Sequence, residues 1–242
     1  MADRYCILIP HYCHDAQLAS FLPELVQVQL PLLVVDDGSD AATLPRLRGL
    51  VAEYPWAQLI ERQPNQGKGA TMIAGMRHAQ GQGFTHVIIV DADGQHAARD
   101  LVRLHKASLS APLALFSGNP QFGQDIPKAR LYGRMITNVL ARLAAGTDVI
   151  KDAMCGLRLY PLAQVLPLCE RVGARLHMEL DTELLVRACW AGLELRYVDT
   201  QVVYPAGGRS HFRMISDNLR LTLMHITLLA LAARKRIDGG AP

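Results

Sequence analysis

Short apolar runs alternate along the first half of the chain with longer segments whose apolar residues recur with a helical period. The run at 87–90, Val-Ile-Ile-Val, is wholly apolar and lacks the polar alternation of a strand with one face in water. Strands buried on both faces are typical of parallel sheets covered by helices. The pattern therefore predicts an α/β fold with a mostly parallel central sheet flanked by helices. Strands are expected at 5–10, 32–35, 58–61, 87–90 and 113–116.

The alternation weakens after residue 117. A loop containing Gly and Pro is expected at 117–127, followed by helices at 129–145 and 179–191. Near the C-terminus, apolar residues recur at steps of three and four, which predicts an amphipathic helix. Its apolar stripe comprises Phe212, Ile215, Leu219, Leu223, Ile226 and Leu229.

Two uses remain open for this C-terminal helix. Arg209 and the basic run 234–236 place positive charge at its two ends, which suits a helix lying on anionic lipid. The alternative is packing against the core or against a second subunit, which would make the protein a homo-oligomer. The longest uncharged apolar stretch, 221–233, has thirteen residues, whereas a bilayer span takes roughly 20. We expect no membrane crossing, and at most peripheral contact at the inner face of the membrane.

Charge and cysteine content narrow the class of protein. The 25 Lys and Arg nearly balance the 22 Asp and Glu, so the net charge of +3 does not indicate a nucleic-acid-binding protein. The five cysteines lack the close spacing of a zinc site or of a secreted disulfide framework, which favours a cytoplasmic protein. They are Cys6, Cys13, Cys155, Cys169 and Cys189.

Polar motifs follow three of the predicted strands. Asp-Asp-Gly-Ser stands at 36–39, Asn-Gln-Gly-Lys-Gly at 65–69 and Asp-Ala-Asp-Gly-Gln-His at 91–96. In open α/β sheets, ligands bind beyond the carboxyl ends of the strands. We therefore expect all three motifs to face one crevice.

Each motif has a chemical interpretation and a structural one. Asp91 and Asp93, one residue apart, can both reach one hard cation, although a turn also favours Asp and Gly. The 36–39 motif alone is equally typical of a loop with a helix cap. Lys68 and the backbone amides around it could bind phosphate at a helix start, or the glycines could simply form a turn.

The order of the three motifs resembles glycosyltransferase family 2, which has the GT-A fold, over roughly residues 4–212. Within that family, Asp-Ala-Met-Cys-Gly-Leu-Arg at 152–158 is similar to a segment of the dolichol- or polyprenyl-phosphate sugar transferases. The resemblance implies a Rossmann-like GT-A domain at 1–212, with a nucleotide-sugar half at about 1–117 and an acceptor half at about 118–212. The amphipathic helix and tail would occupy 213–242.

The resemblance also implies roles for individual residues. Asp37 would lie near the nucleotide base, Asp91 near the ribose and the metal, and Asp93 and Gln95 on a Mg²⁺ or Mn²⁺ ion. Cys13 and His14 stand where the family usually has Asn and Glu, which makes recognition of the base less certain. The nucleotide sugar would be bound by Pro10, Tyr12, Asp36, Asp37, Asn65, Lys68 and Asp91.

The implied reaction is inverting, metal-assisted displacement from a nucleoside-diphosphate sugar to an acceptor such as a polyprenyl phosphate at the membrane surface. A phosphate acceptor is already ionised, because its second pKa is ~6. A sugar hydroxyl, the alternative acceptor, would need a base, for which Glu179 and Asp181 are the candidates unless they only begin a helix. The cations expected for the donor diphosphate or the acceptor phosphate are Arg130, Arg134, Arg158 and Arg209, with Ser210 beside them. Arg130 and Arg134 could instead simply be solvated on a helix face.

Three other classes compete with a transferase. Haloacid-dehalogenase-like phosphatases share Asp-x-Asp-Gly, but Gln95 stands where they usually have Thr, and three predicted strands precede the motif here. A nucleotidyltransferase would carry a Gly-rich basic signature that 7–14 lacks. A non-catalytic sugar-nucleotide-binding protein would bind the donor without turnover.

Overall fold

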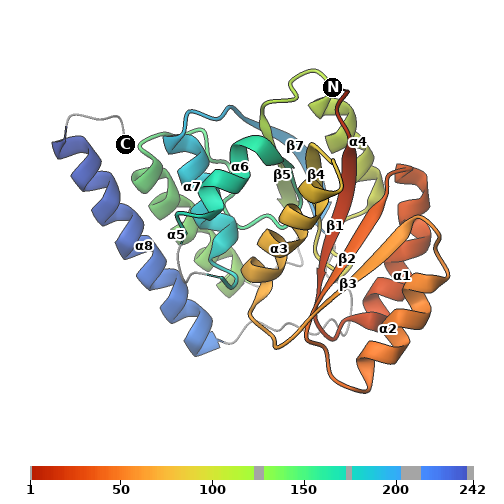
Figure 1. Cartoon of the computed structure of the whole chain (residues 1–242). Coiled ribbons are helices and arrows are strands. Elements are labelled where there is room, and N and C mark those ends of the chain that lie inside the picture. The colour runs from red at the N-terminus through yellow and green to blue at the C-terminus, as the bar shows by residue number, and fades with distance from the viewer. Residues whose placement is uncertain (1, 123–127, 173–175, 203–213, 239–242) are drawn as a thin grey trace.

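A single seven-stranded sheet forms the centre of the protein. The computed structural model describes residues 2–122, 128–172, 176–202 and 214–238 (Figure 1). The strand order is β3-β2-β1-β4-β6-β5-β7, and β6 alone runs against the others among the described strands. This mixed, mostly parallel sheet confirms the predicted fold class. The strands are β1 (Tyr5–His11), β2 (Leu32–Asp37), β3 (Ala57–Arg62), β4 (His86–Ile89), β5 (Leu115–Phe122), β6 (Arg158–Pro161) and β7 (Leu195–Val202).

Helices cover both faces of the sheet, and each face has its own apolar core. One face is covered by α1 (Asp15–Leu25), the short 3₁₀ helix η1 (Val26–Val28), α2 (Thr43–Ala52) and α4 (Ala98–Ser108). The other is covered by α3 (Lys68–Gly81), α5 (Lys128–Ala145), α6 (Leu162–Cys169), α7 (Leu180–Trp190) and α8 (Met214–Ile237). Because β1, β2 and β4 are covered on both sides, their side chains are nearly all buried, which explains why these sequences are apolar except at their ends.

The second half of the sheet differs from the prediction. β5 continues to Phe122, through part of the expected loop at 117–127, because its pairing with β7 supports Gly118 and Pro120 at the end of the strand. β6 and β7 were not predicted. β6 has four residues and begins with an arginine, and β7 is an edge strand of mixed polarity, so neither has the apolar run that marks β1 or β4.

Helix α8 is present as predicted, and it packs on the core through a face other than the predicted stripe. Met224, Leu228 and Ala232 are buried against the core. The predicted stripe residues from Ile215 to Ile226 face solvent instead, and Leu229 is partly buried, whereas Phe212 lies outside the described residues. The helix is apolar on two opposite faces, so periodicity alone could not identify the buried one.

The topology determines where a ligand can bind. After β1 the chain builds β2 and β3 on one side of that strand, and then crosses to place β4 on the other side. Adjacent parallel strands whose connections leave in opposite directions open a crevice at their carboxyl ends. The motif at 36–39 begins with the last two residues of β2, and the motif at 91–96 follows β4, so both lie at this edge.

Candidate active site

A lysine joins the motifs at the carboxyl edge of the sheet. Lys68 is the first residue of α3, and its Nζ lies 2.7 Å from Oδ1 of Asp91, which follows β4. The same Nζ lies 2.9 Å from Oδ2 of Asp181, in the first turn of α7. Burial lowers the pKa of Lys68, but the two carboxylates outweigh this effect and raise it overall. A charged ammonium therefore links three segments that are far apart in the sequence.

Asp93 completes a pair of carboxylates with Asp91. Burial and the negative charge of Asp91 raise the pKa of Asp93 to about 6, and the Gln95 backbone N–H donates to Asp93 Oδ1 at 3.1 Å. Lys68 and the Gln95 N–H act in the opposite direction, but their effect on the pKa of Asp93 is smaller than that of burial and Asp91. Two carboxylates that repel one another are suitable ligands for a hard divalent cation.

The donor set fits a cation that is only partly coordinated by protein. Within the described ranges, no group of three or more His, Cys, Asp or Glu side chains is arranged around a common point. A cation held by Asp91, Asp93 and the side-chain amide oxygen of Gln95 would keep coordination positions open for substrate oxygens, as is usual for Mg²⁺. These residues are therefore compatible with Mg²⁺ or Mn²⁺ bound together with a phosphate ligand.

Asp37 connects the end of β2 to the loop before α3. Its carboxylate accepts hydrogen bonds from the backbone N–H groups of Gln66, at 3.1 Å, and Gly67, at 2.7 Å. Arg62 Nη1 donates to the same carboxylate at 3.1 Å. Three donors on one buried carboxylate fix the loop that carries Lys68, so the position of Asp37 determines where the ammonium lies.

Asp36 holds the neighbouring loop. His11 Nδ1 lies 2.8 Å from Asp36 Oδ1, and the backbone N–H of Ser39 donates to Oδ2 at 2.9 Å. Burial raises the pKa of Asp36, but these partners reverse that effect and hold it below its ordinary value. The helix-cap contact at α2 comes from Asp40, which accepts from the Thr43 N–H at 2.7 Å. Asp36 therefore orders the loop after β2 without capping the helix.

The glycines of the 65–69 motif allow a second segment to approach. A Cβ on Gly67 would overlap the ring of His177, and one on Gly69 would lie 2.7 Å from the backbone of Leu176. The Ala70 N–H donates to the Leu176 carbonyl at 2.9 Å. This contact brings 176–181 to the start of α3 and places Asp181 within reach of Lys68. The role of His177 and Leu176 was not predicted, because nothing in their local sequence indicates a partner so far away.

Gly156 is another residue whose role was not predicted from the sequence. It lies two residues before β6, and a Cβ at this position would overlap the carboxylate of Asp91. The crevice wall can approach Asp91 this closely only if residue 156 has no side chain. The resemblance at 152–158 included this glycine, but motif comparison gave no role to it.

Arg158 lies away from the predicted phosphate contact. Its side chain is 1% exposed, its Nη1 donates to the backbone carbonyl of Asp181, and its Nη2 donates to that of Ala153 at 2.8 Å. A guanidinium enclosed in this way cannot reach a phosphate in the crevice. The structure therefore corrects the assignment: Arg158 supports the backbone at Asp181.

The remaining predicted residues are spread around the crevice. Arg134 on α5 pairs with Asp152 at 2.6 Å and stacks over the Phe122 ring, while Glu179 is buried and accepts from the His177 N–H at 3.4 Å. Pro10 is half-buried in β1, and Tyr12 and Asn65 are exposed. Arg130 lies on α5, but its side chain is outside the described part, as are Arg209 and Ser210.

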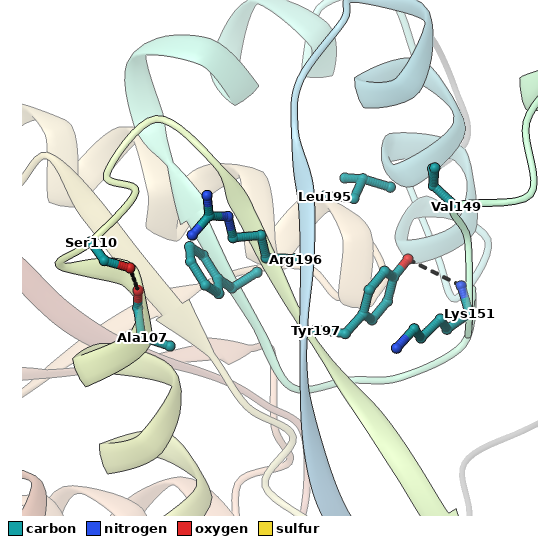
Figure 2. Close-up of a pocket in the computed structure, with 8 residues that line it drawn as sticks. Ala107, Ser110, Val149, Lys151, Leu195, Arg196 and Tyr197 are labelled. Atoms are coloured by element: carbon teal, nitrogen blue, oxygen red, sulfur yellow. Dashed lines mark hydrogen bonds between the residues drawn. The ribbon is translucent and has the colours of Figure 1, made fainter.

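A shallow cavity of about 550 Å³ lies elsewhere, at the amino-terminal ends of β5 and β7. Figure 2 shows Lys151, Arg196 and Tyr197 around it, with the Lys151 backbone N–H donating to the Tyr197 hydroxyl at 3.2 Å. None of the predicted site residues lines this cavity. The chemistry predicted from the motifs belongs to the opposite edge of the sheet.

Comparison with known proteins gives consistent results. The family described as Glycosyl transferase family 2 matches residues 6–160. A dolichyl-phosphate beta-glucosyltransferase of Trichomonas vaginalis is 26% identical over 205 residues, which cover 75% of this chain and 60% of that protein. A UDP-N-acetylglucosamine–dolichyl-phosphate N-acetylglucosaminyltransferase of Methanococcus voltae is 23% identical over 222 residues, which cover 84% of this chain and 88% of that protein.

A solved structure shares the fold. Glucosyl-3-phosphoglycerate synthase from Mycobacterium tuberculosis, crystallised with Mn²⁺ and uridine-diphosphate-glucose, superposes with a TM-score of 0.67 at 16% identity. The superposition covers 96% of this chain and 79% of that one. At this identity the likeness establishes the arrangement of helices and strands alone.

Proposed function

The chain belongs to glycosyl transferase family 2, and from this premise we propose that it transfers a hexose from a nucleoside-diphosphate sugar to a lipid-linked phosphate. The dolichyl-phosphate transferases among its relatives support a phosphate-bearing lipid as acceptor. The chain spans only 60% of the length of one of them. The activity of that whole relative is therefore only proposed for this protein.

The observation that carries the proposal is the bridge from Lys68 to Asp91 and Asp181. In the proposed complex, Asp91, Asp93 and Gln95 hold Mg²⁺ or Mn²⁺, and Asp181 faces the acceptor side. The bound cation would act as a Lewis acid on the diphosphate oxygens. Lys68 remains protonated, because its carboxylate partners raise its pKa, and it stabilises charge that develops on the leaving diphosphate.

The ion pair between Asp181 and Lys68 favours a phosphate acceptor over a sugar hydroxyl. A general base must be free to take a proton, whereas Asp181 shares a short ion pair with Lys68. A phosphate monoester attacks as an anion and needs no base, because its second pKa is ~6. We therefore propose that Asp181 positions Lys68, and that the acceptor itself supplies the nucleophilic oxygen.

The proposal is tested by a transfer assay with purified protein, Mn²⁺ and radiolabelled uridine- or guanosine-diphosphate hexoses. Each donor is offered polyprenyl phosphate, the matching polyprenol without phosphate, or a free sugar. We expect labelled lipid with polyprenyl phosphate alone. Transfer to the free sugar alone would identify a hydroxyl acceptor, and donor binding without transfer to any acceptor would identify a non-catalytic binding protein.

Gly156 provides a separate prediction about the cation site. Gly156→Ala places a methyl group where the Asp91 carboxylate lies, so that carboxylate must move. We expect the affinity for Mn²⁺ with a nucleoside diphosphate, measured by isothermal titration calorimetry, to fall by about tenfold or more, a typical effect of displacing a ligand or its support. The control is Gly49→Ala on α2, where an added Cβ meets nothing. Equal affinities in the two variants would contradict the assignment of Asp91.

A further inference from the structure

Helix α8 presents an apolar stripe to solvent in addition to the face that it buries. Ile215, Leu219, Leu223 and Ile226 recur at steps of four, four and three, so they lie on one side of the helix. Each of these side chains is more than half exposed. The core contacts of α8 are made by the opposite side, through Met224 and its neighbours. Among the described residues, the stripe therefore takes no part in packing within the chain.

Helix α5 also presents an apolar stripe to solvent and buries its opposite side. Its outward residues Tyr132, Met135, Ile136, Val139 and Leu143 are each more than half exposed, while Thr137, Ala141 and Ala144 on its other side are buried. Eleven of the sixteen large apolar residues that are exposed in the described part of the chain lie on α5 and α8. Apolar side chains concentrated in this way mark an interaction site.

The two stripes lie on neighbouring helices. Helices α5 and α8 pack against each other, and Arg236 near the end of α8 donates to the Leu143 carbonyl near the end of α5 at 3.3 Å. Figure 1 shows α8 at the outer edge of the molecule, beginning at the end where β1 and β2 finish. We call the nine outward side chains of these two stripes the α5–α8 surface.

The charge of these helices indicates what covers the surface. Each helix carries four Lys or Arg residues, and between them they carry one acidic residue, Asp217. Asp217 is buried and pairs with Arg220. Arg142 donates only to backbone carbonyls among its described contacts, and Arg234 is 82% exposed. Arg134 pairs with Asp152 and Arg234 with Asp238, so part of this charge is compensated. Arg142, Lys235 and Arg236 have no ion pair among the described contacts, and the two helices remain net positive.

We propose that the α5–α8 surface docks the protein on an anionic lipid bilayer, with both helices lying in the plane of the interface. Apolar side chains between basic ones are the features that bind a helix to the headgroup region, since the stripes enter the acyl boundary and the cations attract acidic lipids. No helix of the described residues is long and apolar enough to cross a membrane.

A second copy of the chain fits this surface less well. A two-fold symmetric dimer brings the same patch of both subunits together, so two surfaces of net positive charge would face each other. Like charges across an interface oppose association, whereas anionic lipid complements them. Charge complementarity therefore selects the membrane.

The docking inference concerns this surface alone and is tested without donor, metal or acceptor. Vesicles of phosphatidylcholine containing about one third phosphatidylglycerol, and vesicles of pure phosphatidylcholine, are sedimented with the protein. We expect binding to the anionic vesicles to be at least about tenfold stronger, and to weaken as salt is raised. A failed transfer assay would leave this result intact, and a failed vesicle assay would leave the proposed reaction intact.

Two double variants locate the contact. Leu219→Glu with Leu223→Glu changes α8, and Ile136→Glu with Val139→Glu changes α5; all four side chains are exposed, so we expect both variants to fold. Each adds two negative charges and removes two apolar contacts, which should weaken binding by about twentyfold or more. The control is Leu109→Glu with Leu113→Glu, exposed to a similar degree after α4, which should bind as the wild type does.

Three outcomes would overturn the proposal. The first is no binding of the wild type to anionic vesicles, and the second is equal loss in the control variant. The third is a dimer in analytical ultracentrifugation that both α5 and α8 variants dissociate, because a second copy would then cover the surface. Thermal melting of each variant checks that lost binding does not reflect lost structure.

Discussion

Asp93→Asn should lower the rate of sugar transfer by about 10³-fold or more, because a carboxylate proposed to hold the cation becomes a neutral amide that binds it weakly. The same change should leave the melting temperature unchanged or raise it. Burial and the charge of Asp91 raise the pKa of Asp93, which means that the fold disfavours its ionised form. A loss of rate with no loss of stability separates a functional carboxylate from a structural one.

Transfer kinetics at saturating Mn²⁺ and a thermal melt in its absence provide the two measurements. Asp3→Asn is the matched control, since Asp3 is exposed just before β1, at the other end of the sheet from the crevice. It should retain the wild-type rate. If Asp93→Asn keeps metal-dependent transfer at the wild-type level, the proposed cation site is wrong.

Lys68→Met should lower the transfer rate by about 10²-fold while strengthening the binding of Mn²⁺ alone. The rate falls because a fixed positive charge near the leaving diphosphate is lost. In the wild type, Lys68 Nζ lies 2.7 Å from Asp91 Oδ1. Metal binding strengthens in the variant because this ammonium no longer competes with the cation for that carboxylate. The two measurements move in opposite directions only if the ammonium and the cation share Asp91.

Kinetics and Mn²⁺ titration of the Lys68 variant are compared with those of Lys106→Met, which changes a lysine in the last turn of α4. The Lys106 variant should match the wild type in both measurements. Weaker Mn²⁺ binding in Lys68→Met would show that Lys68 supports the metal site without competing for it, and an unchanged rate would remove Lys68 from the proposed reaction.

The sequence predicted the half of the site that is encoded locally. Asp91 and Asp93 follow an apolar strand directly, so the strand pattern and the rule for parallel sheets were sufficient to place them at the crevice edge. The fold class followed from the same pattern. The assignments of these residues to metal and nucleotide remain predictions that the experiments above test.

The other half of the site depends on contacts between distant segments. Arg158 was expected at phosphate, because an arginine in a motif suggests an anion, yet it is enclosed by the carbonyls of Ala153 and Asp181. Gly156 is needed because of Asp91, which lies 65 positions earlier in the chain. Neither the burial of a single polar side chain nor the close approach of distant segments leaves a periodic signal in the sequence. The sequence also did not reveal which face of α8 is buried, because both sides of that helix are apolar.

The carboxylate of Asp37 has a consequence for the thermodynamics of donor binding. Its hydrogen bonds with the Gln66 and Gly67 amides and with Arg62 restrain the segment between β3 and α3. The conformational entropy of this segment is therefore lost during folding, before any ligand arrives. A nucleotide that meets a preorganised loop loses less of its interaction energy to ordering the protein, so in the proposed complex this segment would add little to the entropic cost of binding the donor.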